Sequence, residues 1–190
     1  QKHYEDTIQY LLDNNAPLDG IGMQGHFSSS PTAIPRIFEI VERFHQQFPD
    51  LAIRTTEFDV DTLDEQLQAD YTRDFMTMFF SHPATVGIQK WGFWAGAHWR
   101  PSAAMYTLDW QEKPNALVWK ELIFNTWWND FTGATDSNGE FSARGFYGTY
   151  EVTVNHNETA VSCLFELTPE ASAFIVPMDA SLLTDGMCQQ

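Results

Sequence analysis

The sequence predicts an α/β fold, namely part of a (β/α)8 barrel followed by a small antiparallel β domain. Three observations predict it. Helical and extended patterns alternate over the first two thirds of the 190 residues. The extended patterns begin roughly 30 to 35 residues apart, which is the repeat of such a barrel. Beyond residue 130 the helical patterns give way to short runs separated by glycine and asparagine. We therefore expect a barrel part over residues 1–130 and a small β-sandwich-like extension over 131–190.

The first barrel elements follow from apolar spacing and from residues that end helices. Residues 4–12 carry apolar side chains at helical spacing, and Pro17 lies just beyond them. An apolar run over 18–23 predicts a short strand. Ser30 before Pro31 predicts a helix cap followed by proline at the first helical position. That helix should continue to residue 48.

The remaining elements repeat this order. Residues 51–60 alternate into a strand with a polar exit, and a helix is expected over 67–79. The next apolar run covers 86–93, and another helix is expected around 115–128. Four short runs in the tail predict strands, at 141–146, 149–154, 161–167 and 173–176.

Only three barrel strands are visible, and three strands cannot close a barrel. The remaining strands could lie in sequence outside this chain or in another chain, or the fold could be something other than a closed barrel. We favour sequence outside this chain.

The composition restricts the partners. Acidic residues outnumber basic ones by 26 to 10, which gives a formal charge of −16. Nucleic acid and anionic membranes would be repelled, so neither is expected as a partner. Seven Trp and six Tyr could stack on sugar rings, although core packing accounts for many aromatic residues. No apolar run is long enough to span a bilayer, and no signal peptide pattern opens the chain, so we expect it to begin mature or already cut.

The cysteines and a sequon point to an oxidising compartment. Cys163 and Cys188 are the only cysteines, so one disulfide is possible between them. Asn157-Glu158-Thr159 is a glycosylation sequon. Together they predict a secreted, extracellular glycoprotein. We expect no cofactor and no metal site, because the six histidines show no ligand spacing.

Polar residues follow each predicted strand, at the end where barrel enzymes place their active sites. Glu57 and Asp59 are two apart in one strand and should point to the same side, where His26 from the neighbouring strand could meet them. Taken singly, Glu57 could be a solvated carboxylate and His26 a structural histidine. Their occurrence on successive strand exits favours a site.

Three segments make a resemblance specific. Gly22-Met23-Gln24-Gly25-His26, Thr55-Thr56-Glu57-Phe58-Asp59-Val60 and Trp91-Gly92-Phe93-Trp94 resemble the sixth, seventh and eighth strand segments of glycoside hydrolase family 10. The tail over 135–150 is similar to the C-terminal extension of plant-type members. The resemblance implies strands 6–8 of a (β/α)8 barrel and a retaining endo-β-1,4-xylanase acting on xylan or a related β-1,4-glycan.

The resemblance also implies roles for individual residues. Glu57 matches the nucleophile, and His26 and Asp59 match the residues that orient it. The positions matching sugar contacts are Gln24, Trp91, Trp99 and, as a weaker candidate, Arg100.

Two departures from the family pattern bear on activity. The family's acid/base glutamate, in a Trp-x-x-x-Asn-Glu segment at the fourth strand, has no counterpart here, so we expect the 190 residues alone to be inactive and the first barrel half to be a partner. Ala95 stands where plant-type relatives commonly carry an acidic residue. The alternative function is therefore a catalytically inactive glycan-binding or structural extracellular glycoprotein derived from a xylanase.

Overall fold

A computed structural model describes residues 2–189, and the chain divides into two compact units. The barrel unit ends at Thr126 and the tail unit begins at Trp127. The division falls four residues before the expected boundary at 130. Helix α4 (Pro114–Glu121) runs into a π-helical turn (Leu122–Thr126), and the barrel unit ends with that turn.

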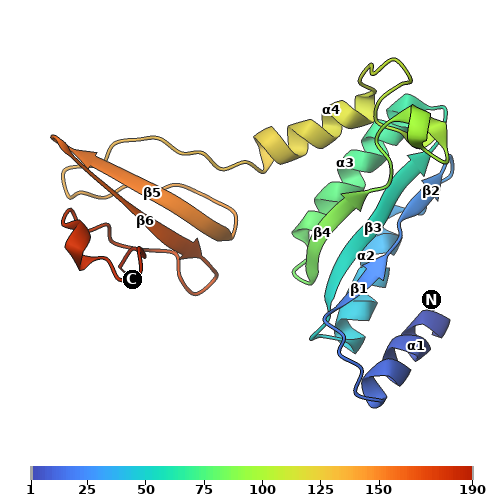
Figure 1. Cartoon of the computed structure of the whole chain (residues 1–190), viewed down its shortest axis with the longest axis horizontal. Coiled ribbons are helices and arrows are strands. Elements are labelled where there is room, and N and C mark those ends of the chain that lie inside the picture. The colour runs from blue at the N-terminus through green and yellow to red at the C-terminus, as the bar shows by residue number, and fades with distance from the viewer. Residues whose placement is uncertain (1, 190) are drawn as a thin grey trace. The chain divides into compact units, whose positions relative to one another are not determined.

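The barrel unit is built on one parallel sheet with β3 (Ala52–Asp61) at its centre (Figure 1). On one side β3 pairs with β1 (Gly20–Met23) and then with β2 (His26–Ser28). On the other side it pairs with β4 (Thr85–Lys90). The three expected strands are thus present in order, but the first is broken into two segments.

Gly25 lies at the break between β1 and β2. Its φ of +84° is in the left-handed region, where glycine has no steric penalty. A Cβ at this position would also lie 2.9 Å from Cγ2 of Thr55 on the neighbouring strand. The break therefore needs glycine, and it brings the next residue, His26, into register with Asp59.

The helices of the barrel unit are α1 (Lys2–Asp13), α2 (Ile34–Gln47), α3 (Glu65–Ser81) and α4. Asp64 caps α3 by accepting hydrogen bonds from the backbone N–H groups of Gln66 and Leu67. The expected cap at Ser30 is wrong, because α2 begins at Ile34. Pro35 explains the difference: proline lacks an N–H and fits only the first turn of a helix, so the helix starts just before it.

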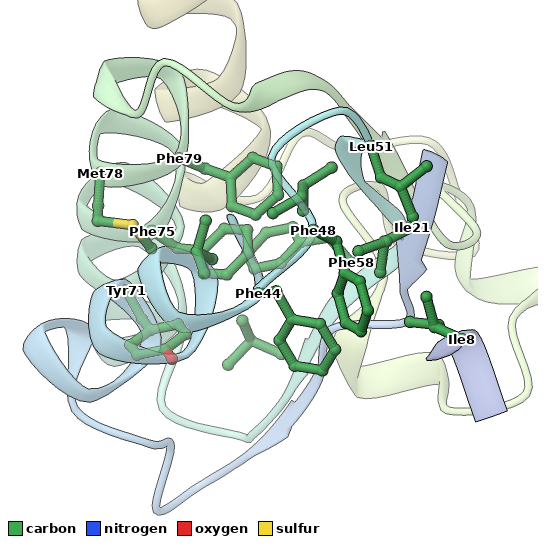
Figure 2. Packing of buried hydrophobic residues seen from close by; sticks show 13 residues of the cluster. Ile8, Ile21, Phe44, Phe48, Leu51, Phe58, Tyr71, Phe75, Met78 and Phe79 are labelled. Carbon is green, nitrogen blue, oxygen red and sulfur yellow. The ribbon is translucent and has the colours of Figure 1, made fainter. Parts of the chain in front are cut away.

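Aromatic side chains from α2, α3 and β3 form the barrel unit's core (Figure 2). The rings of Phe58 and Phe75 stack with centroids 4.5 Å apart, and Phe79 continues the stack at 5.5 Å from Phe75. The other members come from α1, β1, α2, β3, α3 and the connection between α2 and β3: Ile8, Ile21, Val41, Phe44, Phe48, Leu51, Ile53, Val60, Tyr71 and Met78. This packing fixes the helix-facing side of β3.

The end of β3 alternates between two faces. Phe58 and Val60 are buried in the core. Glu57, Asp59 and Asp61 occupy the alternate positions, so they point to the opposite face of the sheet. A core on one face therefore presents a row of carboxylates on the other.

The tail unit contains one antiparallel hairpin, β5 (Gly148–His156) and β6 (Thr159–Leu167). The described tail residues do not form the expected β-sandwich-like extension, because only two of their four expected runs form strands. Residues 141–146 are interrupted by Gly145, and 173–176 is stopped by Pro177 and makes a single bridge, Ile175 to Gln189. Too few residues extend in register for a second sheet.

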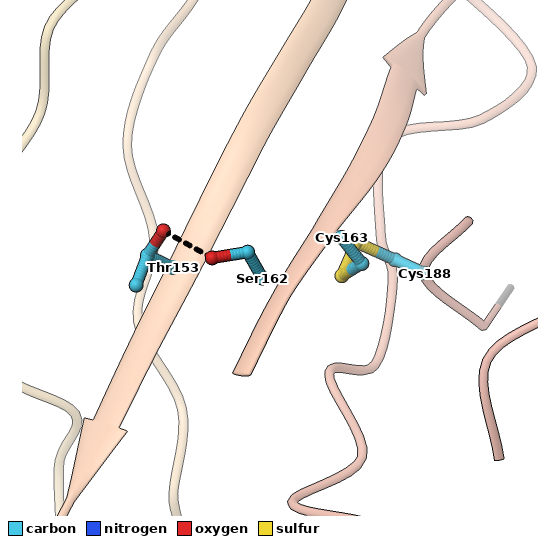
Figure 3. Close-up of a disulfide and its surroundings, with 4 residues drawn as sticks. All are labelled: Thr153, Ser162, Cys163 and Cys188. Atoms are coloured by element: carbon cyan, nitrogen blue, oxygen red, sulfur yellow. Dashed lines mark hydrogen bonds between the residues drawn. A yellow bond between two sulfur atoms is a disulfide. The ribbon is translucent and has the colours of Figure 1, made fainter. Parts of the chain in front are cut away.

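The expected bond between Cys163 and Cys188 is present, with a Cα–Cα distance of 5.1 Å (Figure 3). It joins β6 to the C-terminal segment. Beside it, the rings of Phe165 and Phe174 pack with their centroids 4.2 Å apart.

Within residues 2–189, no helix has the length and apolar character needed to cross a bilayer.

Candidate active site

The structure brings Glu57, His26 and Asp59 together at the C-terminal ends of the parallel strands. The backbone sets their positions: the N–H of Glu57 donates to the carbonyl of Gln24 at 2.9 Å, and the N–H of Asp59 donates to that of Gly25 at 3.2 Å. These two bonds lock β3 against the broken strand beside it. The clustering expected from the strand exits is therefore observed.

His26 bridges the two carboxylates. Its Nδ1 lies 2.9 Å from Oδ1 of Asp59, and its Nε2 lies 3.1 Å from Oε2 of Glu57. The Asp59 side chain is 2% exposed, whereas those of His26 and Glu57 are each 27% exposed. The buried carboxylate thus anchors the imidazole, and the imidazole orients the accessible carboxylate.

Two tryptophans flank this group. Trp99 Nε1 donates to Oδ2 of Asp59 at 3.3 Å, and the edges of Trp99 and Trp91 meet the His26 ring at centroid distances of 5.5 and 6.4 Å. The two residues remain 58% and 42% exposed. Large exposed rings beside a carboxylate suit stacking against a sugar.

The two remaining predicted sugar contacts, Arg100 and Gln24, also lie near the site. The Arg100 guanidinium lies over the Trp99 ring at 4.8 Å, and its Nε is 3.7 Å from Oδ2 of Asp61. Gln24 is exposed and lies at the strand break two residues before His26. Gln24 and His26 border a cavity of about 610 Å³, but apolar side chains of α2 and α3 line its other walls. That lining is unsuited to a polar sugar.

Two residues near Asp59 were given no role by sequence reasoning, Lys90 and His98. Burial lowers the pKa of Lys90 to about 8, partly opposed by the charge of Asp59. Lys90 Nζ donates to the carbonyl of Ala103 at 3.0 Å. The His98 side chain is 0% exposed and its Nε2 is 3.7 Å from Oδ2 of Asp59. A polar residue ending the β4 strand was the available signal for Lys90, and the His98-Trp99-Arg100 run was the signal for His98.

Among residues 2–189, no three His, Cys, Asp or Glu side chains are grouped to hold a metal ion. The chemistry that this arrangement supports is nucleophilic attack by a carboxylate fixed at the mouth of a parallel sheet.

The comparisons with known proteins agree with this geometry. Residues 1–123 match glycosyl hydrolase family 10, and the chain belongs to that family. The α/β fold prediction is confirmed by solved structures. Xylanase 10B of Thermotoga petrophila in complex with xylobiose has a TM-score of 0.56 and 26% identity, covering 64% of this chain and 41% of that one.

Two curated relatives extend the comparison. Anti-sigma-I factor RsgI6 of Acetivibrio thermocellus is 36% identical over 149 residues, which is 77% of this chain and 19% of that protein. Endo-1,4-beta-xylanase 1 of Arabidopsis thaliana is 30% identical over 179 residues, 93% of this chain and 18% of that protein. The second match reaches into the tail unit. The chain spans about a fifth of the length of these relatives.

Proposed function

We propose that the intact protein is a retaining endo-β-1,4-xylanase in which Glu57 is the nucleophile. The observation that carries the proposal is the chain of contacts from Glu57 to His26 to the buried Asp59. It fixes an accessible carboxylate at the strand ends, where barrel enzymes act. Similarity to endo-1,4-beta-xylanase 1 and to the xylobiose-bound xylanase 10B supports xylan as the substrate class.

The proposed reaction has two steps. A Glu57 oxygen bonds to the anomeric carbon, the glycosidic bond breaks, and the leaving oxygen takes a proton from a second carboxylic acid. Water, deprotonated by that second group, then attacks the same carbon and releases Glu57. Trp91 and Trp99 would stack on the sugars beside the cleaved bond, with Gln24 and Arg100 bonding sugar hydroxyls.

Asp59 is a poor candidate for the second carboxyl. A retaining pair stands about 5 to 5.5 Å apart with both groups facing the substrate. Asp59 is buried, and its oxygens accept from His26 and Trp99. The acid would therefore come from the first half of the barrel, and the 190 residues alone would be inactive.

The open edges of the sheet support a missing half. Among residues 2–189, β1, β2 and β4 each pair only with β3. These strands are therefore edge strands, with which further strands can pair as barrel closure requires. Val86 on β4 is 63% exposed, which fits an apolar side chain that the rest of the barrel would cover.

The decisive experiment uses a protein that includes both barrel halves. Glu57→Gln should lower kcat for xylan by roughly 10⁴ to 10⁶-fold, the loss seen when a covalent nucleophile is removed. Glu39→Gln, which changes an exposed carboxylate on α2, is the matched control and should leave kcat unchanged. A 2-fluoro xylobioside with a good leaving group should add its sugar mass to Glu57 in the parent protein. Full activity of Glu57→Gln, or labelling of another residue, would overturn the assignment.

The alternative is a glycan-binding protein without hydrolysis. Two observations favour it: the relative at 36% identity is named as an anti-sigma-I factor rather than as a hydrolase, and Ala95 replaces an expected acidic residue. Xylo-oligosaccharide binding by the intact protein without turnover or covalent labelling would support this role. Ala95→Glu should then leave turnover absent.

We also propose that the protein is a secreted glycoprotein carrying a glycan on Asn157. Asn157 and Glu158 form the two-residue turn between β5 and β6, where Asn157 has a φ of +54° and is exposed. An enzyme that releases N-linked glycans should reduce the mass of the natural protein, and the Thr159→Ala protein should show no such loss.

A further inference from the structure

His98 occupies a buried position directly behind Asp59. Its side chain is 0% exposed, and within residues 2–189 its Nε2 has no hydrogen bond of standard geometry. The nearby acceptors are Oδ2 of Asp59 at 3.7 Å and the backbone carbonyl of Trp91. A buried N–H without a good partner is rare in folded proteins, so this atom needs an explanation.

The tautomer of His98 follows from its other nitrogen. Nδ1 accepts a hydrogen bond from the backbone N–H of Arg100 at 3.0 Å. Burial lowers the pKa of His98, and the neighbouring charge of Lys90 lowers it further, so the ring is neutral. A neutral ring that accepts at Nδ1 carries its proton on Nε2. Oδ2 of Asp59 lies 3.7 Å from the nitrogen that carries this proton, whereas His26 contacts Oδ1.

The exit of β4 is shaped around this ring. Gly92 has a φ of +59°, and a Cβ there would lie 2.5 Å from Cδ2 of His98. The backbone at Gly92 is therefore folded closely over the imidazole. The same ring also holds the backbone after Trp99, because its Nδ1 accepts from the N–H of Arg100.

We propose that His98 is a positioning residue that holds the Asp59 carboxylate, and through it His26, against Glu57. Asp59 then lies between three N–H groups: His26 on Oδ1, with Trp99 and His98 on the Oδ2 side. A short movement of the carboxylate would bring Nε2 of His98 within hydrogen-bond distance. The catalytic part of the inference rests on the proposed function, whereas the link from His98 to His26 does not.

His82 provides a matched control within the same unit. Its Nδ1 also accepts from the backbone N–H two residues later, Ala84 at 3.2 Å, and its Nε2 faces a carboxylate, Glu42, at 3.0 Å. Its side chain is likewise 0% exposed. Unlike His98, His82 has no described hydrogen bond or ion pair with Glu57, His26 or Asp59. Replacing His82 therefore removes a buried imidazole of the same kind and leaves the site residues unchanged.

The test compares four forms of the protein with both barrel halves: parent, His98→Phe, His98→Gln and His82→Phe. His98→Phe keeps an aromatic ring but loses the donor, and it should lower kcat about 10 to 100-fold with KM changed less than about threefold, as expected for a displaced reacting group. His98→Gln places an amide N–H where Nε2 was and should recover most of kcat. His82→Phe should lower Tm and keep kcat. Unchanged kcat in His98→Phe, or no recovery in His98→Gln, would overturn the proposal.

A second readout separates failure of this inference from failure of the proposed function. In ¹⁵N-histidine NMR spectra, His98 should show a protonated Nε2 and an unprotonated Nδ1. The ring ¹⁵N shifts of His26 should move in His98→Phe and stay fixed in His82→Phe. If the parent protein does not hydrolyse xylan but these shifts behave as stated, the positioning link stands and the proposed function fails. A protonated Nδ1 on His98, or unmoved His26 shifts, removes the link whatever the activity.

Discussion

The two units of this chain bury different kinds of side chain. Every polar or charged residue that is buried among residues 2–189 lies in the barrel unit, including Asp59, Gln68, His98 and Lys113. The buried side chains of the tail unit are Val161, Phe165 and the disulfide-bonded Cys163 and Cys188. Burying a polar group without full hydrogen bonding is costly. The barrel unit therefore carries the cost of buried polar groups, Asp59 and His98 at the site among them, whereas the described tail residues that are buried are apolar or disulfide-bonded.

The largest expected effect tests the tail unit. Replacing Cys163 and Cys188 together by Ser should lower its free energy of unfolding by about 3.5 kcal/mol, from the entropy of a loop closed over a sequence separation of 25. Hydrogen exchange should show faster exchange at β5 and β6 amides and unchanged exchange at β3. Equal acceleration at β3 would mean that the units do not unfold separately.

The next effect tests the stability given up in the barrel unit. Lys90→Met should raise the free energy of unfolding by about 1 to 2 kcal/mol at pH 7, because the partly buried ammonium is disfavoured in the folded state. The Lys90 pKa is about 8 when folded, against 10.5 when unfolded. Between these values the unfolded parent binds more protons, so parent stability rises with pH.

The advantage of Lys90→Met should therefore shrink from pH 8 upward and vanish near pH 10.5. Denaturant unfolding of both proteins at pH 7, 9 and 10.5 measures the difference, in which the contributions of titrating groups that do not interact with Lys90 cancel. A difference that stays constant with pH would show that the gain comes from packing rather than from the buried charge.

The smallest effect concerns polar pairs on the surface of the tail unit. Thr153 and Ser162 face each other across the hairpin, with their hydroxyl oxygens 2.8 Å apart (Figure 3). Thr153→Ala should lower the free energy of unfolding by less than about 1 kcal/mol, the usual range for a cross-strand pair. Hydrogen exchange at β6 amides gives the measurement. A loss as large as that from the disulfide would show that polar contacts also carry the tail unit.

Periodicity predicted the strands and helices of the barrel unit, because each has one face packed in a single core. Alternation in β3 placed Glu57 and Asp59 on the face away from Phe58, and the strand order brought His26 beside them. The break at Gly25 was not predictable, since it depends on the approach of Thr55 from another strand. The helix start predicted at Ser30 and Pro31 was wrong, because Pro35 is the proline that lies in the first turn of α2.

The tail was harder to predict, because short apolar runs do not show whether a partner strand exists. Residues 173–176 extend as the pattern predicts, yet the one backbone bridge described for them joins Ile175 to Gln189. His98 and Lys90 escaped sequence reasoning for a similar reason. Nothing in a single histidine or lysine shows that it will lie against a buried carboxylate, which is a property of the folded sheet ends.

The two-residue turn at Asn157-Glu158 has a consequence for the order of folding. All pairs of the hairpin, from His156 with Thr159 to Gly148 with Leu167, are local in sequence. Hairpins of this kind form in about 1 to 10 μs, whereas the parallel partners of β3 must first close much longer loops. During synthesis the hairpin can be complete once Leu167 has emerged from the ribosome, before Cys188 has emerged. The finished β6 strand then holds Cys163 in a fixed position when Cys188 arrives to form the disulfide.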